Sequence, residues 1–410
     1  LQFRSTCWAA GQVMQSVQEA IANLIERASV LPVVDSIKVT HSLGRILAED
    51  VVACVDVPPA DNSAMDGYAF CYEDAIKHDY SLPISQRIPA GTPSRPLQAN
   101  TAARIFTGGE IPAGADTVAM QENCTEHGNT VKLSPSIVSK SNVRPRGQDI
   151  TAKSIILTAG AHLGPAEMGL LSSQGFNQVM VYARLKVAIF STGDELVEPG
   201  FELKSGQIYN SNHATLIGLI QSLGMECIDL GTVPDDLEAT KAILQRAALT
   251  SDIVISAGGV SVGEEDHVKD AVADLGSIEF WRVAIKPGKP LAFGRVGDTP
   301  FIGLPGNPAS VFVTFTVLAR PFLLASQGLR VRHKPMLKVA ALFNRPAESR
   351  EVYLRGRLIC SEKGDGVEIY PNQSSGVLSS VSWGDVLVRQ NSGEKIQFDD
   401  LVDVLVYSSY

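Results

Sequence analysis

The sequence predicts a multidomain protein of α/β and β parts, organised around one doubly wound parallel α/β domain. Its 410 residues are too many for one ordinary hydrophobic core. Residues 181–328 alternate β-prone runs with helical patterns, as expected for a parallel sheet that is covered on both faces. Residues 56–144 and 331–410 instead carry short β-prone runs between turn signals, so we expect a β domain in each.

Composition limits the function classes. The net charge is -9 without any block of like charges, which argues against general nucleic-acid binding. The six cysteines lie far apart and lack the short spacings of zinc sites, which suits a reducing cytoplasm. No secretory signal is expected, because Gln and Glu interrupt the N-terminal segment. The longest apolar run, residues 311–325, contains Arg320 and Pro321 and is too short to span a bilayer.

The N-terminal region combines a helix with irregular structure. Apolar residues at helical spacing predict a helix over residues 12–28. We therefore expect residues 1–30 to form an N-terminal helix that packs on the α/β domain. Residues 31–55 are expected to hold a short extended piece and a helical turn around residues 43–47.

Residues 145–180 complete a small linker domain together with residues 31–55. A helix is predicted near residues 165–174, because Pro stands at its start and Gly175 lies beyond its end. The loop 144–149 mixes two arginines with an aspartate. Guanidinium groups suit oxyanions, but a solvated inter-domain linker explains the same composition.

The small β domain, residues 56–144, contains two candidate functional loops. Residues 61–69 place two acids and small residues directly before an aromatic strand start. The alternative is a polar turn in which Asp and Asn cap their own backbone. Residues 107–109 read Thr-Gly-Gly, where bare backbone could approach a ligand or simply form a hairpin turn.

The α/β domain has a regular order of elements. Strands are predicted at residues 185–191, 225–232, 252–257, 278–285, 291–296 and 301–304, and helices at 212–223, at 236–248, from 266 and from 308. The first strand ends in Ser191-Thr-Gly-Asp-Glu-Leu196, which brings two carboxylates to the carboxyl edge of the sheet. Open α/β sheets bind ligands at that edge, although an isolated Gly-Asp-Glu is also an ordinary solvated turn.

Two later loops of this domain suit anions. Residues 256–263 follow a strand, are rich in glycine and open a helix, so backbone N–H groups can point at a phosphate. This loop matches neither the usual dinucleotide pattern nor the Walker pattern. Residues 304–310 have the same placement with a proline on either side of the turn. Lys286 and Lys289 add positive charge.

Three acids accompany these anion loops. Glu195, Asp235 and Asp266 each follow a different strand of the predicted sheet. Acids and anion cradles at one edge are compatible when a divalent cation lies between them. Mg²⁺ takes one or two carboxylates and completes its shell with water and substrate phosphate. The sequence therefore predicts a magnesium-dependent anion site, unless each loop is only ordinary turn chemistry.

The C-terminal region, residues 331–410, is predicted to be a small β-barrel or sandwich. Apolar and polar residues alternate around residues 336–341, 386–389 and 402–406. Two of its segments, 355–357 and 373–376, are possible contributors to a site. In isolation each is equally explained as a solvated loop.

Five motifs in this order give the chain a specific resemblance. They are Asp61-Asn-Ser-Ala-Met-Asp-Gly-Tyr68, Phe190-Ser-Thr-Gly-Asp-Glu-Leu196, Ser256-Ala-Gly-Gly-Val-Ser-Val-Gly263, Ile285-Lys-Pro-Gly-Lys-Pro290 and Gly303-Leu-Pro-Gly-Asn-Pro308. Together they resemble the MoeA family, the molybdopterin molybdenumtransferases, and are similar to the C-terminal domain of gephyrin. The resemblance extends from about residue 12 to the end of the chain.

The resemblance implies an activity and an assembly. Such an enzyme takes adenylylated molybdopterin and molybdate, inserts the metal at the dithiolene with Mg²⁺, and releases AMP. The implied subunit has four domains, with a MogA-like molybdopterin-binding domain at 181–328 and a C-terminal β-barrel. It forms an elongated homodimer through residues 31–55 and 145–180. The site then lies between the α/β domain of one subunit and the β and linker domains of the other.

The resemblance also assigns residues to roles. The implied catalytic residues are Asp66, Thr107, Asp149, Glu195, Asp235, Lys286, Arg355 and Ser375. The implied substrate-binding residues are Gly193, Asp194, Gly258, Gly259, Ser261, Gly263, Lys289, Pro305, Gly306, Asn307 and Pro308. Glu195 and Asp266 are the implied Mg²⁺ ligands. The chain departs from the family pattern at Gln148, often an acid in relatives, at Ser374, commonly Gly, and at Arg282, where Lys also occurs.

Two other functions fit the same sequence features. The chain could adenylylate molybdopterin, as MogA-like domains do, and consumption of ATP would identify that activity. It could also be a non-catalytic molybdopterin-binding scaffold, which AMP release would exclude. In each case we expect a cytoplasmic homodimer that meets other proteins of molybdenum cofactor biosynthesis, without contact to nucleic acid or membrane.

Overall fold

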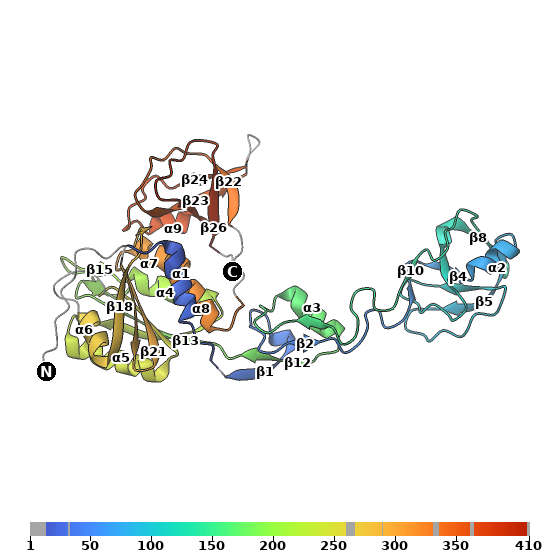
Figure 1. Cartoon of the computed structure of the whole chain (residues 1–410), viewed down its shortest axis with the longest axis horizontal. Helices are drawn as coiled ribbons and strands as arrows, with labels where there is room; N and C mark the ends of the chain where they lie inside the picture. The colour runs from blue at the N-terminus through green and yellow to red at the C-terminus, as the bar shows by residue number, and fades with distance from the viewer. Residues whose placement is uncertain are drawn as a thin grey trace. The chain divides into compact units, whose positions relative to one another are not determined.

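The computed structural model describes residues 14–31, 33–259, 267–288, 290–330, 336–360 and 365–407. These residues form two compact units (Figure 1). The first unit contains the described parts of residues 1–35, Gly44–Ala48 and Val181–Tyr410. The second unit contains Ser36–Leu43 and Glu49–Met180.

A six-stranded sheet is the centre of the first unit. The strand order is β16 (Glu226–Val233), β13 (Lys186–Thr192), β17 (Ile253–Ala257), β21 (Thr299–Leu304), β20 (Pro290–Val296) and β18 (Gly276–Arg282). The first four strands are parallel, which confirms the doubly wound parallel domain. The last two run antiparallel to their neighbours. The sequence did not indicate this, but the two-residue connection at Gly297 and Asp298 permits only a hairpin.

Helices cover both faces of this sheet (Figure 1). The helices are α1 (Val17–Glu26), α4 (Ser211–Ser222), α5 (Leu237–Thr250), α6 (His267–Leu275), α7 (Pro308–Thr314), the π-helical η3 (Phe315–Ala319) and α8 (Arg320–Ser326). Val187 and Ile189 share one core with α1, α4, α7, η3 and α8. Ala188 and Phe190 share the opposite core with α5 and α6. The alternation along β13 follows from the two-residue period of a strand that is buried on both faces.

Residues 308–326 form a continuous helical segment from α7 to α8. It is long and apolar enough to cross a membrane, yet 78% of it is buried inside the first unit. Its apolar side chains pack against the sheet and against α1. The burial explains the hydrophobic composition, because this segment is a core helix of the α/β domain.

The C-terminal part of the first unit is a closed barrel. Its ring consists of β23 (Glu351–Ile359), β24 (Gly366–Ile369), β22 (Leu337–Ala341), β26 (Leu401–Val406) and β25 (Val386–Gln390), which pairs back with β23. Of the two predicted alternatives, a β-barrel or a sandwich, the structure shows the barrel. A short helix, α9 (Ser379–Trp383), follows the connection from β24. The short strand β19 (Ile285–Lys286) pairs with the start of β23, which joins the α/β domain to the barrel.

The second unit contains a six-stranded sheet. Its order is β7 (Thr117–Met120), β4 (Gly67–Phe70), β6 (Ala102–Ile105), β5 (Ser81–Ile88), β9 (Thr130–Leu133) and β8 (Cys124–His127), with α2 (Tyr72–Lys77) after β4. The two-stranded pairs β2 (Val51–Val52) with β11 (Ile155–Leu157) and β3 (Asn62–Ser63) with β10 (Val143–Arg144) bring distant segments together. The helix α3 (Pro165–Ser173) lies where the Pro and Gly signals predict it.

The helical turn predicted around residues 43–47 is wrong. The structure places a short 3-10 helix, η1 (Val39–His41), just before that position. Gly44 follows with a φ of +74°, a left-handed conformation that ends helical geometry. Leu47 is instead extended and forms an isolated bridge with Val181.

Replacing a buried and an exposed leucine by alanine tests the assignment of residues 308–326 to the core. Leu323 is 0% exposed, whereas Leu249, on α5, is 87% exposed. We expect Leu323→Ala to lower the free energy of unfolding of the α/β domain by about 2–5 kcal/mol, because it leaves a cavity. Leu249→Ala is the matched control and should change it by less than about 0.5 kcal/mol. Urea unfolding measures both, and equal effects would contradict the assignment.

Candidate active site

A cavity of about 760 Å³ lies at the carboxyl ends of the parallel strands of the first unit. The loops after β13, β17 and β21 contribute Glu195, residues 258–259 and residues 305–308 to its lining. Lys286 lines the cavity as well, and residues 373–375 form a wall from the barrel. The structure thus joins loops that the sequence indicated separately, at the edge where open α/β sheets bind ligands.

The loop after β13 forms an arm, residues 194–209, whose two ends contribute Glu195, Leu196, Ile208 and Tyr209 to the cavity lining. Its two short strands, β14 (Leu196–Val197) and β15 (Ile208–Tyr209), pair in parallel. The backbone N–H of Ile208 donates to the carbonyl of Glu195 at 2.8 Å, and that of Asn210 donates to Val197 at 3.0 Å. These bonds fix the backbone of Glu195, whose residue lines the cavity.

The backbone conformation and close packing after β17 require glycine at positions 258 and 259. Gly258 and Gly259 have φ values of +94° and +66°, which L side chains rarely adopt. A Cβ at position 259 would also lie 2.3 Å from the Val268 side chain. The cavity is therefore lined by bare backbone at this point. Backbone without side chains allows the close approach of a phosphate, as the sequence predicts.

The turn after β21 connects three walls of the cavity. Gly258 N donates to the carbonyl of Leu304 at 3.1 Å. The Asn212 side chain, at the start of α4, donates from Nδ2 to the carbonyl of Gly306 at 2.6 Å. Ala309 N donates to the carbonyl of Ser375 in the barrel wall at 2.9 Å. The loop after β17, the helix α4 and the barrel are therefore held to one turn.

Lys286 is a lining cation that already has a partner. Its Nζ lies 2.9 Å from Glu348 Oε1. The hydrogen bond from Lys286 lowers the pKa of the Glu348 carboxyl, and the charges of Arg345 and Arg350 lower it further. Part of the positive charge expected of Lys286 is thus balanced before any ligand binds.

Arg350 also lines the cavity and was missed in the sequence. Its Nη1 donates to the carbonyl of Ile285 at 3.0 Å, which holds the side chain beside Lys286. Arg350 belongs to no spacing motif, so only the fold brings it here. Asn212 was overlooked for the same reason. It lies in the cavity wall, and its Oδ1 is buried without a hydrogen-bond partner among the described residues.

Arg355 supports the barrel wall from behind. It is 0% exposed, and burial lowers the pKa of its guanidinium to about 10. Its Nε donates to Ser380 Oγ at 2.9 Å, and its Nη2 donates to the carbonyl of Ser374 at 3.1 Å. Arg355 itself does not line the cavity, unlike Ser375. Its place in the structure is that of a residue that positions the loop 373–375.

Some of the expected site residues lie outside the cavity lining, and others lie outside the described residues. Asp194 Oδ1 accepts a hydrogen bond from Asp235 N at 3.2 Å, beside Gly193 and outside the cavity lining. Ser261, Gly263, Asp266 and Lys289 lie outside the described residues. Within the described part of the chain, no group of three or more His, Cys, Asp or Glu side chains could hold a metal ion. Of the two implied Mg²⁺ ligands, Glu195 is the one within the described residues, and it lines the cavity. Mg²⁺ can take a single protein carboxylate together with substrate phosphate.

Three further residues that were predicted for the site belong to the second unit. Asp66 Oδ1 accepts hydrogen bonds from both N and Oγ1 of Thr107, each at 2.7 Å. These bonds lower the pKa of Asp66, so the carboxylate is kept ionised. Asp149 is exposed, and its side chain makes no hydrogen bond within the described residues. The structure therefore brings Asp66 and Thr107 together as a pair.

Comparison with protein families divides the chain into three matches. Residues 15–175 match "MoeA N-terminal region (domain I and II)". Residues 188–325, which contain most of the cavity lining, match "Probable molybdopterin binding domain". Residues 338–407, the barrel, match "MoeA C-terminal region (domain IV)".

Whole-chain comparisons agree with these matches. The molybdopterin molybdenumtransferase of Haemophilus influenzae is 38% identical over 356 residues, covering 86% of this chain and 88% of that protein. The protein of the same name from Nostoc is 40% identical over 362 residues, covering 84% and 82%. A crystal structure of the molybdopterin biosynthesis MoeA protein of Pyrococcus horikoshii has a TM-score of 0.83 at 26% identity, covering 96% of this chain and 100% of that chain.

Replacing Arg355 tests its supporting role. The single Nζ of a lysine cannot occupy the positions of both Nε and Nη2, so Arg355→Lys should lower the free energy of unfolding of the barrel by about 1–3 kcal/mol. Amides of residues 373–376 should then exchange faster with solvent. Arg357→Lys is the matched control on the same strand, because Arg357 is a partly exposed partner of Glu368, and should cost less than about 1 kcal/mol. Unchanged exchange in Arg355→Lys would contradict the assignment.

Proposed function

The chain belongs to the MoeA family of molybdopterin molybdenumtransferases, and we propose that it inserts molybdenum from molybdate into adenylylated molybdopterin with release of AMP. This places it in molybdenum cofactor biosynthesis. The observation that carries the proposal is the cavity of the first unit, which the matched molybdopterin-binding region forms together with the barrel. Its volume of about 760 Å³ lies in the range of small-molecule sites.

The cavity chemistry suits these two substrates, because both are anions. The whole chain carries a net charge of -9, so anion binding requires local compensation. Lys286 and Arg350 supply positive charge at one end of the cavity. The bare backbone of Gly258 and Gly259 supplies a surface that phosphate can approach closely. We assign the binding of phosphate to these four residues.

Glu195 is the residue we assign to magnesium binding, with Asp266 as the second expected ligand. The arm holds the Glu195 backbone at the cavity wall. When bound there, Mg²⁺ would act as a Lewis acid on the phosphoanhydride. Without a cation, the Glu195 carboxylate would repel the phosphates of the substrate. Lys286 would then hold the phosphate in place, and the loop 373–375, kept in position by Arg355, would close the barrel side of the cavity.

We further propose that the chain works as a homodimer in the cytoplasm and meets other proteins of the same biosynthesis. Apolar side chains of the second unit support the dimer, because Leu43, Val52, Val55 and Ile155 are all exposed. Val52 and Ile155 are paired in register on β2 and β11 and extend one apolar surface. The five described cysteines are all free, which agrees with a reducing compartment.

Replacing the Glu195 carboxylate tests the catalytic proposal. Glu195→Gln keeps the size of the side chain and removes its charge. We expect the variant to fold and to bind adenylylated molybdopterin, but to lose most AMP release in a single turnover with molybdate and Mg²⁺. Glu202→Gln, an exposed position on the same arm, is the matched control and should retain the parental rate. The measurement is AMP release against Mg²⁺ concentration, with circular dichroism as the folding check.

Two results of that assay would contradict the proposal. Parental rate and parental Mg²⁺ dependence in Glu195→Gln would mean that the metal is held elsewhere. Consumption of ATP by the parent, without AMP release from adenylylated molybdopterin, would instead identify an adenylyltransferase.

The dimer is tested by mass. Light scattering at micromolar concentration should give twice the mass of one chain, which is 43.8 kDa. Ile155→Lys places a charge in the exposed apolar surface and should shift the mass toward that of the monomer, because burying an unpaired charge is costly. Val138→Lys, at an exposed position away from β2 and β11, is the control and should stay dimeric. A monomer mass for the parent would contradict the proposal.

A further inference from the structure

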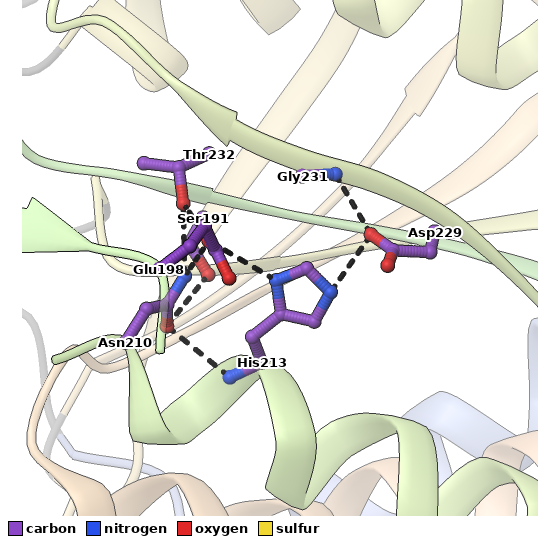
Figure 2. A network of polar contacts seen from close by, with 7 residues as sticks. All are labelled: Ser191, Glu198, Asn210, His213, Asp229, Gly231 and Thr232. Atoms are coloured by element: carbon purple, nitrogen blue, oxygen red, sulfur yellow. Dashed lines mark hydrogen bonds and ion pairs between the residues drawn. The ribbon is translucent and has the colours of Figure 1, made fainter. Parts of the chain in front are cut away.

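A polar network lies at the edge of the cavity, which its member Asn210 lines, and has no role in the chemistry assigned above. It consists of Ser191, Glu198, Asn210, His213, Asp229, Gly231 and Thr232 (Figure 2). These residues come from the end of β13, the arm, the start of α4 and β16. The network therefore connects the arm that carries Glu195 with β13, α4 and β16.

His213 is the buried centre of this network. It is only 8% exposed, and its ring lies between two carboxylates (Figure 2). Nε2 lies 2.8 Å from Asp229 Oδ1, and Nδ1 lies 3.6 Å from Glu198 Oε1. Asp229 also accepts a hydrogen bond from Gly231 N at 2.8 Å, which fixes the carboxylate on β16. Since an ionised carboxylate only accepts, Nε2 is the atom that carries a proton toward Asp229.

Glu198 and Asn210 complete the network on the arm side. Glu198 Oε1 accepts a hydrogen bond from Thr232 Oγ1 at 2.7 Å. Asn210 Nδ2 donates to Thr232 Oγ1 at 3.0 Å, and Asn210 Oδ1 accepts from His213 N at 3.2 Å as the cap of α4. Glu198 of the arm is thus held to β16, while Asn210, the first residue after the arm, is held to β16 and α4. A polar network of this kind is specific in geometry because each unmade bond is costly.

The network holds the arm at Glu198 and directly after its end, at Asn210. Glu198 directly follows β14, and Asn210 directly follows β15. Glu195 lies three residues before Glu198, while Asn212 lies two residues after Asn210. Glu195 and Asn212 both line the cavity. Short lengths of chain therefore connect the network to the cavity-lining Glu195 and Asn212, and its own member Asn210 also lines the cavity.

From this geometry we propose that His213, held by Asp229, is a positioning residue that fixes the arm and thereby the Glu195 carboxylate at the cavity. The positioning of the arm stands on the structure alone. Its consequence for turnover rests on the proposed function. His213 itself does not line the cavity, so its ring acts on the arm through Glu198, whose carboxylate lies 3.6 Å from Nδ1 without a hydrogen bond. The bond to Asn210 comes from the backbone N–H of His213 and does not depend on the ring.

The test measures the stability of the arm by hydrogen exchange, separately from the rate of AMP release. Hydrogen exchange detected by mass spectrometry follows the amides of Ile208 and Asn210, whose bonds to Glu195 and Val197 close the arm. In His213→Ala these amides should exchange on the order of tenfold faster, because at least one charge-assisted hydrogen bond is lost. Exchange in the barrel should not change.

Further variants make the result specific. Glu198→Gln and Asp229→Ala should accelerate exchange at the same amides, and they carry the test if His213→Ala does not fold. Glu226→Gln, an exposed carboxylate on β16, is the matched control and should exchange like the parent. In single turnovers, His213→Ala should slow AMP release at saturating substrate about tenfold while the affinity for AMP, measured by calorimetry, changes less than threefold.

The outcomes distinguish the two proposals. Parental exchange of the Ile208 and Asn210 amides in the three network variants would overturn the positioning role. Faster exchange together with a parental rate of AMP release would show that the arm does not position the catalytic carboxylate. Absence of AMP release from the parent would overturn the proposed function, while the exchange data would still decide the positioning of the arm.

Discussion

The hydrogen bonds of the turn from Leu304 to Ala309 hold together the segments that form the candidate site. Its carbonyl groups accept hydrogen bonds from Gly258 and Asn212, and its last N–H donates to Ser375 of the barrel. One short segment therefore fixes the distances between the β17 loop, α4 and the barrel wall. Two prolines limit the backbone freedom of the turn. The walls of the cavity are thus held in place before a ligand binds, which lowers the cost of binding.

The two cationic side chains of the site are held in position by interactions with neighbouring groups. Lys286 is held by Glu348, and Arg350 is held by a carbonyl group, so neither cation is a freely moving side chain. Pairing fixes the geometry but also reduces the field that an incoming anion meets. Bare glycine backbone compensates without adding charge. The Glu195 carboxylate, which also lines the cavity, would repel a phosphate, and this is why magnesium belongs to the proposal.

The sequence predicts those features that are local. The alternation of strands and helices, the glycine loops and the position of Glu195 depend on short segments, and the structure contains them. Arg350, Asn212 and the pairing of Lys286 with Glu348 could not be predicted, because they come from residues far apart in sequence that no motif connects. Strands were predicted near β18 and β20, but their antiparallel pairing was missed because a buried strand has the same apolar pattern in either direction. The π-helical segment η3 had no signal in the composition.

The central claim is that the cavity of the first unit binds the phosphate of the substrate together with a divalent cation. A crystal structure with AMP and Mn²⁺ in place of Mg²⁺ tests it most directly, because Mn²⁺ gives an anomalous signal. We expect the AMP phosphate to lie against Gly258, Gly259 and Lys286, with the anomalous peak within coordination distance of a Glu195 carboxylate oxygen. AMP bound outside this cavity, or a peak coordinated without Glu195, would contradict the account.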